Sequence, residues 1–161
     1  MRHRLLLLSA LAALALPACQ QSSRGTRITD MADLPLKSTE IPGMDWQSSP
    51  LRANAQYILF DANTRKQREN KVGDYYYFWW YDAEPQKPVK LVMRYTQALT
   101  ASKELSRTIE YKEPRAKAKE HKATFFFAGP DRRREGDVLT WRVELYVDGK
   151  LVDSRQSYLW K

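Results

Sequence analysis

Hydrophobic and polar positions alternate along residues 55–161 in short runs that turn signals separate. The runs are AQYILFD, YYYFWWYD, VKLVMRYTQA, LSRTIEYKE, KATFFFAG, VLTWRVELYV and KLVDSRQSYLW. Short runs rich in β-branched and aromatic residues are typical, at this spacing, of an antiparallel β-sandwich and not of a parallel sheet with crossover helices. The pattern therefore predicts one all-β domain of about seven strands.

The fourth run allows a second interpretation. Leu105 and Ile109 lie four residues apart, and the alanine, lysine and glutamate residues around them favour a helix, which Pro114 would end. The segment also alternates well enough to form a strand over residues 105–112. We expect the strand. A helix around residues 101–113 is the alternative, and it would make the fold α+β.

The last two runs predict a hairpin, because apolar residues alternate along VLTWRVELYV up to an Asp148-Gly149 turn. A two-residue loop would place Glu144 opposite Asp153, and like charges directly opposite each other are destabilising. We therefore expect one extra loop residue, which places Leu145 opposite Leu151.

Seven aromatic residues stand in a row in DYYYFWWYDA, residues 74–83. A strand sends alternate side chains to opposite faces, so one core can hold only half of these rings. Phe78 is the only ring of the run without a polar group. Because buried rings with a polar tip need a partner, we expect its parity to face inward. The inward set is Tyr76, Phe78 and Trp80. The outward set, a candidate aromatic binding face, is Tyr75, Tyr77, Trp79 and Tyr81.

Three interpretations compete for the outward rings, which would expose about 600 Å² at about 150 Å² each. In the first, the chain covers them itself, with the piece from Met44 to Trp46, a helix over residues 101–113 or long basic side chains. In the second, a protein partner or a second copy uses them, because tyrosine and tryptophan are enriched in interface cores. In the third, a glycan stacks on them.

The chain begins with the features of an export signal. A basic start precedes an apolar run from Leu5 to Leu16, which is too short to span a membrane as a helix. The exit Leu16-Pro17-Ala18-Cys19 resembles the lipobox of bacterial lipoproteins. That resemblance implies that residues 1–18 are a signal peptide and that Cys19, the single cysteine of the chain, is lipidated. Two acyl chains hold a protein on a membrane without a spanning helix.

Residues 19–54 contain three prolines and show no sustained periodicity. Such a segment is typical of a linker, so we expect a lipidated tether that joins the anchor to the domain at residues 55–161. The piece from Met44 to Trp46 is the exception. A solvated linker rarely contains these residues, and we expect this piece to dock on the domain.

The order of the predicted elements, and the closing WRVELYVDGKLVDSRQSYLW hairpin above all, resembles the immunoglobulin-like or fibronectin type III-like sandwiches of bacterial envelope lipoproteins. The chain has no cysteine pair, so the inter-sheet disulfide of antibody domains is absent. Gln20 beside the lipobox cysteine resembles the class of lipoproteins sorted to the outer membrane. The resemblance implies an antiparallel immunoglobulin-like sandwich in the cell envelope.

The chain is basic, with 27 lysine and arginine residues against 19 acidic ones. Removal of the signal peptide takes away two arginines, which leaves a mature charge of 27 − 2 − 19 = +6. In an exported protein this charge favours anionic lipid headgroups, acidic glycans or an acidic protein face as partners, and not nucleic acid.

Two loops, residues 63–73 and 130–137, concentrate the positive charge. Successive loops of an antiparallel chain alternate between the two ends of a sandwich, so the first and the fifth loop share an end, opposite the tether. This candidate basic pole consists of Arg65, Lys66, Arg68, Lys71, Arg132, Arg133 and Arg134.

The mature chain offers little for catalysis. Its one histidine, His121, lies among lysines in AKAKEHKA, where we expect a solvated loop. Without a second histidine or a spare cysteine the usual zinc sites cannot form, and Gly149-Lys150 lacks the upstream glycine of a phosphate-binding loop. We expect no enzyme activity, no metal and no cofactor.

These observations predict a lipid-anchored, non-catalytic protein of the bacterial cell envelope, on the periplasmic face of the outer membrane in a host with two membranes. It would bind or scaffold an envelope protein or an anionic glycan through the aromatic face or the basic pole. Self-association, a glycan- or peptidoglycan-binding module, and an accessory lipoprotein subunit of a secretion or envelope-assembly machine are the alternatives.

Overall fold

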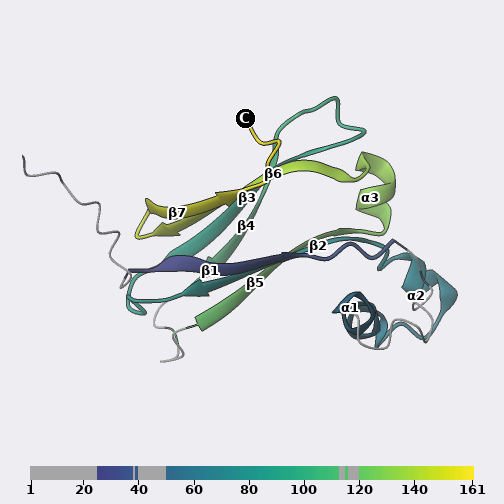
Figure 1. Cartoon of the computed structure of the whole chain (residues 1–161), viewed down its shortest axis with the longest axis horizontal. Helices are drawn as coiled ribbons and strands as arrows, with labels where there is room; N and C mark the ends of the chain where they lie inside the picture. Colours follow the sequence, from purple (N-terminus) through teal and green to yellow (C-terminus); the bar gives the residue numbers. More distant parts are fainter. Residues whose placement is uncertain (1–24, 38, 40–49, 113–114, 116–119) are drawn as a thin grey trace, which may run out of the picture.

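The computed structural model describes residues 25–37, 39, 50–112, 115 and 120–161. These residues form two antiparallel sheets that face each other, with strand orders β1-β2-β5 and β4-β3-β6-β7 (Figure 1). The strands are β1 (Arg27–Asp33), β2 (Gly73–Tyr81), β3 (Val89–Gln97), β4 (Leu105–Tyr111), β5 (Glu120–Ala128), β6 (Val138–Val147) and β7 (Lys150–Gln156). The fold is the antiparallel β-sandwich that the sequence predicts.

The division of the strands between the sheets is immunoglobulin-like. The first, second and fifth strands form one sheet, and the third, sixth and seventh lie in the other. The fourth strand pairs with the third, whereas in the constant-type immunoglobulin arrangement it joins the sheet of the first two strands.

The core between the sheets contains the inward parity of the aromatic run. Tyr76, Phe78 and Trp80 are buried in it, as their alternation predicts. The Phe78 ring meets Phe125 of β5 at 6.1 Å and Trp141 of β6 at 5.5 Å, both edge to face. Burying a side chain of this size contributes about 1.5–3 kcal/mol, so these rings join the two sheets into one core.

The prediction of a first strand at AQYILFD is wrong. Residues 50–59 form helix α1 (Pro50–Leu59), and the run belongs to the end of it. The buried residues of α1 are Ala55, Ile58 and Leu59, at spacings of three and four from the first, and Ala62 just after the helix is also buried. This is the period of a helix, and it gives α1 one apolar face that packs on the outer side of the β1-β2-β5 sheet.

The strand that replaces it lies inside the predicted tether. β1 pairs antiparallel with β2, from Arg27 opposite Tyr81 to Asp33 opposite Tyr76. Only one residue of β1, Ile28, is fully buried, so its seven residues show little alternation in the sequence. The sandwich therefore begins well before the predicted boundary at residue 55. The predicted signal peptide, the lipidation site Cys19 and the piece from Met44 to Trp46 lie outside the described residues.

The ambiguous middle segment is a strand, and the alternative helix over residues 101–113 is wrong. β4 pairs with β3 along its whole length. Leu105, Ile109 and Tyr111 are half-buried and pack against the core, while Ser106, Thr108 and Glu110 are exposed. Leu105 and Ile109 lie on one face of a strand as well as of a helix, because a spacing of four suits both periods.

The β6–β7 hairpin differs from both predicted registers. Asp148 and Gly149 form a two-residue turn, with φ angles of 49° and 74°. After Tyr146 opposite Leu151 the register shifts, and Leu145 lies opposite Asp153. The extra residue of β7 in this bulge keeps the two acids of the simple register apart, because Glu144 now faces Ser154.

Hydrogen bonds from residues next to the bulge also link the two sheets at one side. The Asp153 carboxylate accepts the backbone N–H of Ile28 at 2.9 Å, and Arg155 donates to the Ile28 carbonyl at 3.1 Å. Two side chains of edge strand β7 thus satisfy backbone groups of edge strand β1.

Candidate functional site

The outward rings of β2 do not form a bare surface. Helix α1 lies across the outer side of the sheet (Figure 1), and Tyr75 and Tyr77 are only 9% and 4% exposed beneath it. Trp79 and Tyr81 are half-buried. Arg27 lies over the Tyr81 ring at 5.1 Å, and Lys122 lies over Trp79 at 5.4 Å.

The hydroxyl groups of the two buried tyrosines are also occupied. Tyr75 donates to the carbonyl of Lys71 at 2.7 Å, and Tyr77 donates to Asn54 of α1 at 3.2 Å. Burial raises the pKa of Tyr75 to about 12, so the phenol stays neutral. Of the three interpretations of the outward rings, cover by the chain itself is the one found here. Helix α1 covers the rings, although the sequence predicted a strand in this segment.

The two basic loops lie side by side at one end of the sandwich. They contain the short helices α2 (Arg65–Glu69) and α3 (Pro130–Glu135). Gly129, just before α3, donates its N–H to the Val72 carbonyl at 3.0 Å. It has a φ of 59°, and a Cβ at this position would lie 2.6 Å from the carbonyl oxygen of Asn70. A glycine is therefore needed for this close approach.

The approach brings cations of both helices to one shallow hollow. Arg133 of α3 donates to the side chain of Asn70, after α2, at 3.3 Å. The hollow is lined by Arg65, Lys66, Glu69, Asn70 and Arg133. Arg65 pairs with Glu69 at 2.8 Å. In the part of the chain that the structure describes, neither Lys66 nor Arg133 has a carboxylate within ion-pair distance.

Two of the predicted pole residues instead hold the end of α1. The Lys71 ammonium donates to the Ile58 carbonyl at 2.7 Å and pairs with the Asp61 carboxylate, whose pKa that hydrogen bond lowers. Arg68 donates to the Ala62 carbonyl at 3.1 Å. Cations stabilise the C-terminal end of a helix, where carbonyl groups lack partners, so Lys71 and Arg68 are structural.

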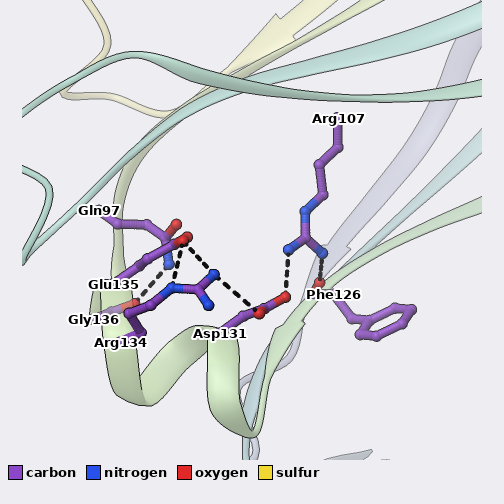
Figure 2. A network of polar contacts seen from close by, with 7 residues as sticks. All are labelled: Gln97, Arg107, Phe126, Asp131, Arg134, Glu135 and Gly136. Carbon is purple, nitrogen blue, oxygen red and sulfur yellow. Dashed lines mark hydrogen bonds and ion pairs between the residues drawn. The ribbon is translucent and has the colours of Figure 1, made fainter.

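Arg134 of α3 lies in a network of ion pairs that also includes Arg107 of β4 (Figure 2). Arg134 pairs with Glu135 at 2.8 Å and with Asp131 at 3.4 Å. Arg107 of β4 reaches Asp131 at 3.1 Å and donates to the Phe126 carbonyl at 2.5 Å. This network fixes α3 against strands β4 and β5.

Acidic partners therefore offset most of the predicted charge. Arg132 pairs with Asp137 at 2.5 Å and lies 3.8 Å from Asp74. With Arg107, which shares Asp131, eight cations stand beside six carboxylates, a net charge of 8 − 6 = +2. The carboxylates are Asp61, Glu69, Asp74, Asp131, Glu135 and Asp137. Among the described residues, Lys66, Arg68 and Arg133 have no carboxylate partner, and of these Lys66 and Arg133 line the hollow.

His121 is not in a solvated loop, and this expectation is wrong. It belongs to β5, and its ring stacks on Trp80 with the centroids 4.5 Å apart. Its Nε2 lies 3.6 Å from the carboxylate of Asp82. Arg115 binds the same buried carboxylate at 2.6 Å, so Asp82 already has a full counter-charge. This cluster joins the ends of β2 and β5 at the far end from α2 and α3.

Among the described residues, no group of three or more histidine, cysteine, aspartate or glutamate side chains is placed to hold a metal ion. The helices of the described segments are all too short or too polar to cross a membrane. No protein-family model matches the chain, and no curated protein matches it. The fold and the two surfaces define the class of the protein: an immunoglobulin-like sandwich with one face covered by a helix and a partly compensated basic end.

Proposed function

We propose that the protein is a lipid-anchored, non-catalytic binding module of the bacterial cell envelope. The lipobox-like sequence before Cys19 supports the anchor. The module presents its basic end to an anionic glycan of the envelope, and in a host with two membranes it stands on the periplasmic face of the outer membrane.

The observation that supports this proposal best is the direction of β2. Arg27, where the described sandwich begins, lies opposite Tyr81 at the last residue of β2. The helices α2 and α3 meet at Gly73, the first residue of β2. A strand of nine residues is about 26 Å long between its end residues, at about 3.3 Å per residue. A chain anchored before residue 25 thus carries its basic end away from the anchored side.

The chemistry of the hollow suits an acidic polymer. Arg65, Lys66 and Arg133 surround it with one carboxylate, that of Glu69. Guanidinium groups bind carboxylate and phosphate oxygens in pairs, and an exposed ammonium adds a charge without fixed geometry. The aromatic version of glycan binding has no support, because Tyr75 and Tyr77 are buried under α1.

Sedimentation with purified peptidoglycan tests the proposal. The protein would be the mature chain with Cys19→Ser, which keeps every described residue. We expect the double variant Lys66→Glu, Arg133→Glu to reduce the bound fraction at least about fivefold at physiological salt. The control is Lys112→Glu, Lys150→Glu, which changes the net charge equally at exposed positions of the opposite end. Equal loss in both variants, or no loss in either, contradicts a role for the hollow.

The anchor has its own test. We expect the full chain to partition with membranes and the Cys19→Ser chain to appear in the soluble fraction. Continued membrane association of the Cys19→Ser chain contradicts lipidation at this residue.

A further inference from the structure

Helix α1 leaves part of the outer sheet face open along β5. A groove of about 620 Å³ runs between them, within the range of small-molecule sites. Its floor contains the largely buried rings of Tyr75 and Tyr77, whose hydroxyls are bonded elsewhere. Residues on both sides of the floor complete the groove: Tyr57, Ile58, Phe60, Asp61, Asn70, Lys71, Lys122, Thr124, Phe126 and Ala128.

The rim of the groove is apolar and unusually exposed. Phe60 is 90% exposed, Tyr57 is 73% exposed and Phe126 is 54% exposed. Phe126 stacks on the floor ring of Tyr75 with centroids 6.1 Å apart and planes at 20°. Exposed rings gathered on both sides of a concave surface are typical of a binding site, whereas single exposed rings are common anywhere.

The two cations of the groove differ in their partners. Lys71 is held by the Ile58 carbonyl and the Asp61 carboxylate. The Lys122 ammonium lies 4.0 Å from the centre of the Tyr77 ring, 5.4 Å from Trp79 and 5.9 Å from Tyr57. Within the described segments, no carboxylate pairs with Lys122. Its charge is therefore positioned by ring faces and left without a counter-ion.

The free edge of β5 is a poor place for a further strand. Arg107 donates to the Phe126 carbonyl at 2.5 Å, and Tyr111 donates to the Lys122 carbonyl at 3.2 Å. Both carbonyls belong to residues whose backbone faces away from β2, the side on which an added strand would bind. These bonds oppose strand addition, so the groove favours a small ligand over an extended peptide or a second copy.

We propose that this groove binds a small amphipathic anion, with its apolar body between the exposed rings of Tyr57, Phe60 and Phe126 and its anionic head at Lys122. The groove shares Asn70 with the hollow of the basic end, but the cation that would bind the ligand, Lys122, belongs to β5, so the inference does not depend on the function proposed there. The charge of Lys122 selects the anionic head, and the rings select a flat or chain-like apolar body.

Anilinonaphthalene sulfonate, an aromatic anion, is a suitable probe, and its fluorescence follows binding to the mature Cys19→Ser chain. We expect one saturable site that weakens as salt is raised. Lys122→Met keeps the side-chain stem but removes the charge, and it should weaken binding about tenfold, or about 1.4 kcal/mol. The chain offers a matched control: Lys90 lies over the Tyr146 ring at 5.0 Å on the other sheet, and Lys90→Met should bind as the wild type does.

A second variant tests the groove without touching its charge. Thr124 lies opposite Tyr77 and between Lys122 and Phe126 on the same face of β5. Thr124→Trp should fill the groove and abolish binding, while the free energy of unfolding reports that the chain still folds. Amide shifts of the native chain on titration should be largest at Lys122, Thr124 and Phe126. Absence of a saturable site, wild-type binding by both groove variants, or equal weakening by Lys90→Met overturns the proposal.

Discussion

The carboxylate of Glu144 lies 3.2 Å from the guanidinium of Arg94 on the outer face of the β4-β3-β6-β7 sheet. The Tyr146 hydroxyl donates to the same oxygen at 2.8 Å, and the other oxygen of Glu144 lies 3.2 Å from Arg142. Arg94 and Arg142 are directly opposite each other on β3 and β6, a pairing that like charges make unfavourable. The largely buried Glu144 therefore neutralises two arginines at once.

We expect Glu144→Gln to lower the free energy of unfolding by about 1–2 kcal/mol at neutral pH, because the two guanidinium groups then face each other without an anion. Urea unfolding measures this loss. Glu104→Gln is the control, since Glu104 is an exposed partner of Arg94 and its loss leaves Glu144 in place. An equal effect of the two substitutions contradicts the special role of Glu144.

The same residue predicts a pH dependence. Burial raises the pKa of Glu144, but the hydrogen bonds from Tyr146 and Arg94 and the charges of the arginines outweigh it, so the pKa lies below its ordinary value of 4.5. The stabilisation is then complete above pH 4.5 and is lost as the pH falls through the folded pKa. The difference in stability between wild type and Glu144→Gln should therefore shrink in acid. A difference that stays constant down to acid pH rules out ionisation of Glu144 as its cause.

Arg115 and Asp82 form the most buried ion pair among the described residues, with side chains 5% and 1% exposed. We expect Arg115→Met to cost about 3–5 kcal/mol, because it leaves a carboxylate in the protein interior with only His121 nearby. Lys87→Met, which breaks an exposed pair with Glu84, should cost far less, because water screens exposed ion pairs. Thermal or urea unfolding of the two variants compares them, and similar losses contradict the difference in burial.

The cover of the aromatic run by α1 is tested at Ile58. Ile58→Ala should destabilise the chain by about 2–4 kcal/mol, whereas Ala at the exposed Phe60 should cost less than about 0.5 kcal/mol. A more disruptive change, Ile58→Asp, should undock α1. Alkaline titration of the phenols then reports the cover: the pKa of Tyr75, about 12 in the native chain, should fall toward 10. An unchanged titration contradicts cover by α1.

Gly129 is expected to be the most sensitive residue of the basic end. Gly129→Ala forces a side chain into a left-handed backbone conformation and against the Asn70 carbonyl, at a cost of about 1–3 kcal/mol. Gly25→Ala, which has open space around it, is the matched control. Amide shifts at Asn70 should show whether α2 and α3 separate in the variant. A Gly129→Ala chain as stable as Gly25→Ala contradicts the close approach.

Local patterns predicted the strands of the core well. Phe78 alone, as the ring without a polar group, was enough to assign the parity of β2, and the structure has its rings on the predicted faces. The loop count placed α2 and α3 at one end, because alternation between the ends follows from antiparallel pairing. It could not predict which cations are compensated. Lys71 caps α1 and Arg68 binds the turn that follows it, and no helix was expected there.

The predictions for α1 and β1 were wrong for different reasons. The residues Ala55, Ile58, Leu59 and Ala62 show the spacing of a helix, and counting this period against the alternation of AQYILFD would have revealed α1. β1 offers no comparable signal, because Ile28 is its one fully buried residue and its stability comes from pairing with β2 and from Asp153 and Arg155.

The sequence by itself determined the β-sandwich class, the strands β2, β3, β5, β6 and β7 and the inward rings of β2, because alternation is a property of neighbours along one strand. It left residues 105–112 open between a strand and a helix, which pairing with β3 decides. Only the tertiary structure decided what covers the outward rings, where the sandwich begins and how β7 shifts its register. These features depend on contacts between segments far apart in the chain. Helix α1 is stable where it lies because its apolar side chains pack on the outward aromatic rings of β2. The bulge in β7 is favourable because it places the Asp153 carboxylate within hydrogen-bond distance of the Ile28 N–H and keeps it from lying opposite Glu144.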